Sequence, residues 1–149
     1  MAGSTVHLTD YSDNDGAKSK VILTGAIGDY GGATSVSANG TKDLAHRSEL
    51  DLALVHGSFR VRIADLDKKI VSAFSHFPSN TSTCSGSVIV TGAAPIIAGS
   101  GTGSYRRISG SFNLTVTIDE VVAKSKCDAS APFLDQAVVI SGSGSVSLG

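Results

Sequence analysis

Residues 99–118 read GSGTGSYRRISGSFNLTVTI, and this stretch decides the fold class. In its second half, Ser111–Ile118, polar and apolar side chains alternate without interruption. A period of two is typical of a β-strand buried on one face, whereas a helix repeats every 3.6 residues. Phosphate-binding glycine loops lead into a helix, whose first N–H groups hold the anion. Because this loop leads into a strand, we interpret it as a turn.

Short alternating segments of the same kind recur along the whole chain. We expect strands at residues 6–8, 20–37 (with a glycine-rich bend at 28–32), 50–54, 59–63, 70–77, 87–90, 111–118 and 137–140. Asn39-Gly40 is a typical hairpin turn. A helix from Asp43 to Gly57 is an alternative, although the alternating leucines of 50–54 favour a strand. Short strands separated by turns predict an all-β sandwich or barrel.

The composition indicates one soluble domain spanning residues 1–149. A chain of 149 residues is long enough to bury its own core. Its content of 41% hydrophobic and 17% charged residues is typical of a soluble globular protein. Its formal charge is −1 and it has no basic stripe, so neither nucleic acid nor an anionic membrane surface is a predicted partner. No apolar run approaches the roughly 18 residues that a transmembrane helix requires. Residues 1–4 lack the features of a signal peptide, although a leader could have been removed.

The two cysteines, Cys84 and Cys127, lie in polar, loop-like contexts. A disulfide between them would close a loop of about 44 residues and stabilise the fold by about 4 kcal/mol. Abundant serine, threonine and glycine also suit an exported protein, so we favour a secreted or cell-envelope location over the cytoplasm. The alternative is two free thiols in a cytoplasmic protein. Neither cysteine has a neighbour at metal-ligand spacing, so no metal site is predicted.

The chain resembles the allene oxide cyclase-like barrel superfamily over residues 90–121, VTGAAPIIAGSGTGSYRRISGSFNLTVTIDEV. This group includes plant allene oxide cyclases, dirigent proteins and bacterial cyclases. Its members join two long barrel strands by a Gly-x-Gly-x-(aromatic)-x-x-(apolar)-x-Gly turn, which corresponds here to Gly101, Gly103, Tyr105, Ile108 and Gly110. Residues 25–41, GAIGDYGGATSVSANGT, are similar to an early stretch of the family. We carry over none of the family's polar lumen residues, because none aligns with this chain.

The resemblance implies a single antiparallel barrel of eight strands, of the calycin type, whose interior is either filled by side chains or wide enough to hold one small ligand. It also implies a cofactor-independent cyclase or isomerase, because ring closure mainly requires that the substrate be held in one conformer away from water. Members of the family commonly form homo-oligomers. The alternative function is a non-catalytic, exported binding or structural barrel stabilised by the disulfide. We predict no cofactor in either case.

Three ionisable residues continue apolar stripes at strand ends, where the mouth of a barrel would lie. They are His56 after Leu50–Leu54, Glu120 after Phe112–Ile118, and Asp29 after Val21–Ile27. A partly buried carboxylate, or a histidine near neutrality, can act as a general acid or base, so these are the candidate catalytic residues. A bulge at Asp119–Glu120 would reverse the direction of the Glu120 side chain. His56 could also simply bond the turn at Gly57.

The predicted ligand contacts are aromatic. Tyr30 and Tyr105 lie beside glycine bends and could hang over a barrel opening; the alternative is a tyrosine that closes the barrel end with its hydroxyl in water. Phe59, Phe74 and Phe112 occupy apolar positions that would line the interior. The predicted ligand is a small apolar or amphiphilic molecule.

Overall fold

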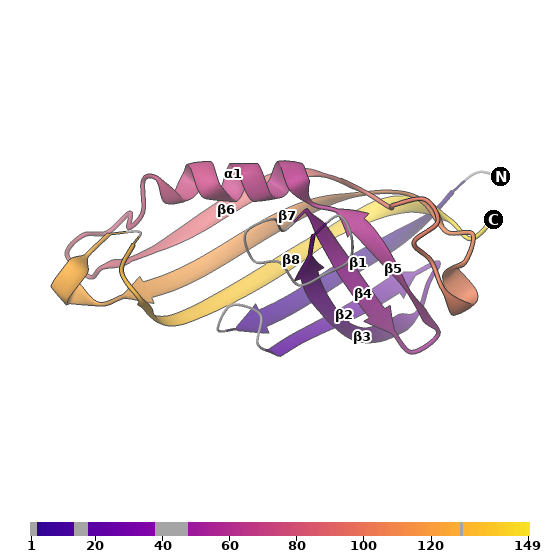
Figure 1. Cartoon of the computed structure of the whole chain (residues 1–149), viewed down its shortest axis with the longest axis horizontal. Helices are drawn as coiled ribbons and strands as arrows, with labels where there is room; N and C mark the ends of the chain where they lie inside the picture. Colours follow the sequence, from indigo (N-terminus) through magenta and orange to yellow (C-terminus); the bar gives the residue numbers. More distant parts are fainter. Residues whose placement is uncertain (1–2, 14–17, 38–47, 129) are drawn as a thin grey trace.

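Nine elements longer than one turn make up the described part of the chain, which comprises residues 3–13, 18–37, 48–128 and 130–149 of a computed structural model (Figure 1). They are β1 (Ser4–Asp13), β2 (Lys18–Gly25), β3 (Asp29–Val36), β4 (Glu49–Leu54), β5 (Gly57–Arg62), α1 (Ala64–Phe74), β6 (Ser85–Pro95), β7 (Ser109–Val122) and β8 (Phe133–Ser147). Two single 3-10 turns, η2 (Gly103–Tyr105) and η3 (Lys124–Lys126), precede and follow β7. The predicted all-β class is confirmed.

The eight strands form one antiparallel sheet in the order β5-β4-β3-β2-β1-β8-β7-β6. The first and last strands pair with each other, so that Ser4 lies opposite Val146. In Figure 1, β4 and β5 run steeply across the direction of β6, β7 and β8, which shows how strongly the sheet curls. At Gly142 a Cβ atom would lie 2.0 Å from the carbonyl oxygen of Asn113, so the backbones of β7 and β8 approach closely there. The sheet is a half-barrel.

The glycine-rich loop between β6 and β7, residues 96–108, joins the two edges of this half-barrel at one end, and we call it the closing loop. Ile96 forms a β-bridge with Val61 of β5, and the Thr102 N–H donates to the carbonyl of Ser58 at 2.8 Å. Glycine is required at position 57, because a Cβ there would lie 2.2 Å from the Thr102 carbonyl oxygen. The loop connects two strands, as predicted, and it also pairs with a third.

The interior is built by the alternation that the sequence shows. Phe112, Leu114 and Val116 are at most 3% exposed, whereas Asn113 between them lies on the outer face. Burial of each such large apolar side chain contributes about 2–3 kcal/mol. The same inner face continues through β1, β2, β4 and β5, whose fully buried side chains include Leu8, Leu23, Leu52 and Phe59. The predicted period of two is confirmed for these strands.

The predicted strand over residues 70–77 is wrong, because the segment 64–74 forms the helix α1. Leu66, Ile70 and Phe74 recur every four residues and therefore share one face of a helix. Asp65 and Asp67 lie in the first turn, where a negative charge interacts favourably with the positive end of the helix dipole. These two signals identify the helix, whereas the short apolar run considered alone suggested a strand.

The bend placed at 28–32 lies at residues 26–28 instead, since β3 already begins at Asp29 and contains Gly31 and Gly32. The strand over the leucines of 50–54 is confirmed as β4. The Asn39-Gly40 hairpin and the helix start at Asp43 lie outside the described residues.

Cys84 and Cys127 form a disulfide, with their Cα atoms 5.3 Å apart. The predicted bridge is confirmed, and the alternative of two free thiols is wrong. The disulfide fastens the chain just before β6 to the segment between β7 and β8. Within the described ranges, no helix combines the length and the apolar character that crossing a membrane requires.

Candidate functional site

Asp29 lies at the start of β3 on the inner face, opposite Leu23 of β2, and its side chain is inaccessible to solvent. Three donors surround its carboxylate. The Tyr30 backbone N–H donates to Oδ1 at 2.8 Å. The His56 backbone N–H donates to Oδ2 at 3.2 Å, and the Tyr105 hydroxyl donates to the same oxygen. Asp29 therefore connects β3, the β4–β5 turn and the closing loop at the closed end of the half-barrel.

His56 lies in the turn between β4 and β5, and it brings an imidazole to the same carboxylate. Its Nδ1 is 3.2 Å from Oδ2 of Asp29, while 62% of its side chain is exposed. The Ser104 N–H donates to the His56 carbonyl at 2.9 Å, which attaches the closing loop to this turn. The imidazole is thus anchored on the Asp29 side and open to solvent on the other. The alternative role, a side chain that bonds the turn at Gly57, is not what the structure shows.

Tyr105 closes the barrel end from the 3-10 turn η2. Its residue is 3% exposed, and its ring packs edge-to-face on Phe59 with the centroids 5.3 Å apart. Tyr105 therefore closes the barrel end as the alternative interpretation had it, but its hydroxyl donates to Asp29 and does not lie in water. A buried hydroxyl needs such a partner, since an unpaired one would cost about 1–3 kcal/mol.

The surroundings shift the pKa values of Asp29 and Tyr105 in opposite directions. Burial opposes the charge of Asp29, but the hydrogen bonds from Tyr105, Tyr30 and His56 together outweigh it and lower the pKa of the carboxyl to about 2. Burial, the hydrogen bond to Asp29 and its negative charge all raise the pKa of the Tyr105 hydroxyl. At neutral pH the site therefore contains a carboxylate and a neutral phenol.

The lowered pKa of Asp29 predicts a loss of stability in acid. A group whose pKa is lower in the folded than in the unfolded chain stabilises the fold above its unfolded pKa of 3.8, and this stabilisation is lost as the pH falls towards about 2. We expect the free energy of unfolding, measured by urea titration, to fall between about pH 4 and about pH 2. In an Asp29→Ala variant this part of the pH dependence should be absent. An unchanged slope in the variant would contradict the assignment.

Glu120 is not part of this site. It keeps the inner-face direction predicted for it, because the irregularity in β7 occurs after it, between Val121 and Val122. However, it lies far along β7 from the closing loop. Gly110, next to that loop at the start of β7, is ten residues away from Glu120, and ten residues of a strand span about 33 Å. There it is half-buried and accepts a bond from Nε2 of Gln136 at 3.4 Å.

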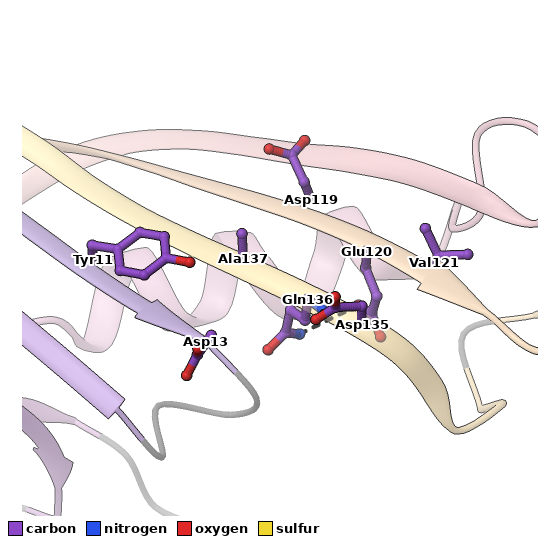
Figure 2. A pocket seen from close by; sticks show the side chains of 8 residues that line it. All are labelled: Tyr11, Asp13, Asp119, Glu120, Val121, Asp135, Gln136 and Ala137. Carbon is purple, nitrogen blue, oxygen red and sulfur yellow. Dashed lines mark hydrogen bonds between the residues drawn. The ribbon is translucent and has the colours of Figure 1, made fainter.

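Glu120 instead lines a cavity of about 330 Å³ at the other end of the molecule (Figure 2). The cavity spans the neighbouring strands β1, β8 and β7, and four of its eight residues are acidic. These residues are Tyr11, Asp13, Asp119, Glu120, Val121, Asp135, Gln136 and Ala137. Among the residues that the structure describes, no group of three histidine, cysteine or acidic side chains is arranged to hold a metal ion.

The aromatic candidates divide into interior and exterior positions. Phe59 and Phe112 are buried on the inner face, and Phe74 packs against the core from α1 rather than from a strand. Tyr30 is 61% exposed and lies on the outer face of β3, next to Asp29 but directed away from it. Tyr105 is the aromatic side chain that joins the Asp29 site.

Asp10 carries another buried carboxyl, and it was not among the residues predicted from the sequence. It lies on the inner face of β1 and accepts a bond from the Ser19 hydroxyl at 2.8 Å. Burial raises the pKa of this carboxyl, although the bond from Ser19 acts in the opposite direction. The alternation Val6, Leu8, Asp10 carried the signal, because it continues an apolar stripe in the way that Asp29 and His56 do.

No match was found between this chain and a family model, a curated protein or a solved structure.

Proposed function

We propose that this protein binds a small apolar or amphiphilic molecule in the barrel, with His56 as the contact for its polar group. The observation that supports this most directly is the exposed imidazole of His56, whose Nδ1 is held 3.2 Å from a fully buried carboxylate. The inner face beyond it is apolar, with Leu23, Leu52 and Phe59 close to the closed end. An apolar wall with a few fixed polar groups is the usual composition of a small-molecule site.

The arrangement of the three residues is suited to proton transfer. When the Nδ1 proton of His56 points at Asp29, the lone pair of Nε2 is directed away from the carboxylate and can accept a proton from a ligand. Asp29 would stabilise the imidazolium that results, and Tyr105 would hold the carboxylate in position. If the imidazolium returns the proton to another atom of the same ligand, the net reaction is an isomerisation that needs no cofactor. This fits the cyclase or isomerase activity that the resemblance to the allene oxide cyclase-like superfamily implies.

A second candidate function is an exported binding protein without catalysis. The Cys84–Cys127 disulfide favours it, because such bonds persist mainly in oxidising compartments outside the cytoplasm. In this case the Asp29 site would only orient the bound molecule. Both candidates require that the protein bind an amphiphile, and they differ in whether that molecule is changed.

The binding prediction can be tested with cis-parinaric acid, a fluorescent amphiphile that carries a conjugated tetraene. We expect a saturable increase in its fluorescence on titration with the protein. His56→Ala should weaken binding about tenfold, which corresponds to the loss of one hydrogen bond of about 1.4 kcal/mol. His76→Ala, which also removes an exposed histidine, is the matched control and should bind as the unaltered protein does.

The outcomes separate the candidates. If the tetraene absorbance changes over time with the unaltered protein but not with His56→Ala, the isomerase is supported. If the probe is bound and recovered unchanged, the binding protein is supported. A fluorescence signal that does not saturate, or equal affinity in His56→Ala, would overturn the proposal.

A further inference from the structure

Residues 64–83, which comprise α1 and the loop after it, form a strap along β6 (Figure 1). Leu66 of α1 is buried over the inner face of β6, where a Cβ on Gly92 would lie 3.3 Å from its Cδ2. Lys69 Nζ donates to the carbonyl of Thr91 at 2.6 Å. Because β5 pairs with the chain at Ile96 and beyond, the strap lies where a neighbouring strand would otherwise cover the β6 edge.

The far end of the strap is fixed at the start of β6. The rings of Phe74 and Phe77 pack with their centroids 5.2 Å apart, and a Cβ on Gly86 would lie 3.1 Å from Phe77 Cε2. The backbone N–H and carbonyl of Asn80 both bond with Ser85. The next fixed point is Cys84, whose carbonyl accepts from the Val122 N–H at 2.9 Å and which the disulfide joins to Cys127.

The strap has little stability of its own. Of its eleven helical residues, Leu66 is the one that is fully buried. The helix has no side-chain hydrogen bond at its N-cap and no basic residue in its last turn. Helices of this length are marginal in isolation, so α1 depends on packing and on the attachment of its two ends. Cys84 also has a φ of +53°, which is unfavourable for a residue with a side chain.

We propose that the Cys84–Cys127 disulfide is a redox-controlled latch, whose reduction releases the strap from β6 and opens the barrel interior. Release of the strap does not depend on the proposed function. The consequence for ligand access does rest on that function, because it requires that a ligand enter the interior. The molecule would thus bind its ligand faster in reducing than in oxidising surroundings.

A dithiol reductant opens the latch by thiol–disulfide exchange. Its thiolate attacks Sγ of Cys127, since Cys127 is half-buried whereas Cys84 is 3% exposed. The S–S bond breaks, and Cys84 leaves as a thiolate that takes up a proton. The second thiol of the reductant then displaces Cys127 from the mixed disulfide. The products are two protein thiols and the oxidised, cyclic reductant.

Hydrogen exchange followed by mass spectrometry tests the release of the strap. The quantity to measure is the exchange rate of peptides from residues 64–83 relative to peptides from β1, with and without dithiothreitol. The ratio corrects for any general loss of stability. We expect reduction to raise it by about tenfold or more, which is typical of a segment that opens without global unfolding. A Cys84→Ala/Cys127→Ala variant should have the raised ratio without reductant, and adding reductant should not change it.

The binding rate of cis-parinaric acid, measured by stopped-flow fluorescence, is the second readout and should rise on reduction. An unchanged exchange ratio, or a reduced protein in which β1 and the strap exchange together, would overturn the latch even if the probe binds. A raised ratio in a protein that never binds the probe would leave the latch supported and the proposed function contradicted. A raised ratio with an unchanged binding rate would refute control of access by the latch.

Discussion

Replacing Asp29 with alanine is expected to lower the free energy of unfolding by about 3–5 kcal/mol. The substitution removes the acceptor of the Tyr105 hydroxyl and of the backbone N–H groups of Tyr30 and His56. These donors lie at the closed end of the barrel, and Tyr105 itself is buried. Urea unfolding at neutral pH measures the loss, because Asp29 is fully ionised there.

Two comparisons identify the cause of this loss. Tyr105→Phe removes one of the donors and keeps the ring on Phe59, so it should cost about 1–2 kcal/mol. Asp135→Ala, at an exposed position of β8, should change stability by less than about 0.5 kcal/mol. If Asp29→Ala were as mild as Asp135→Ala, the carboxylate would not hold the barrel end together.

Removal of the disulfide is expected to cost about 4 kcal/mol, the second large effect. The bridge joins residues 43 positions apart, and breaking it restores the conformational freedom of that loop in the unfolded chain. The measurement is the free energy of unfolding of the Cys84→Ala/Cys127→Ala variant compared with that of the oxidised protein. The reduced, unaltered protein should unfold at nearly the same denaturant concentration as the variant.

The variant also supplies the control, because a reductant should have no effect on it. A difference below about 1 kcal/mol between the oxidised protein and the variant would show that the unfolded chain is already restricted over this loop. That result would contradict the entropic origin of the stabilisation. It would not contradict the presence of the disulfide in the oxidised protein.

The strands could be predicted from the sequence because a half-buried strand has a period of two that can be read locally. The alternation over Ser111–Ile118 identified the centre of β7, and the alternating leucines identified β4. The strand lengths were underestimated. β8 continues through Gly142 and Gly144, which pair normally with β7. This part of the strand was not predicted because glycine gives no periodic signal.

The candidate site could be predicted only in part. Asp29 and His56 were found because they continue apolar stripes, but their contact depends on which strands become neighbours when the sheet curls. Tyr105 lies 76 positions from Asp29 and reaches it because the closing loop folds back onto β5. Glu120 carries the same local signal as His56 and lies at the opposite end. Local alternation therefore gives the direction of a side chain and not the end of the barrel at which it lies.

The bond from Lys69 to the Thr91 carbonyl has one more consequence. An unprotected strand edge offers a row of free carbonyl and N–H groups onto which a strand of another molecule can add. The ammonium of Lys69 bonds to one of these carbonyls, and α1 runs alongside β6 (Figure 1). A helix that covers an edge strand is one way in which proteins prevent edge-to-edge pairing, so we expect a chain that loses this cover to be prone to add strands along β6.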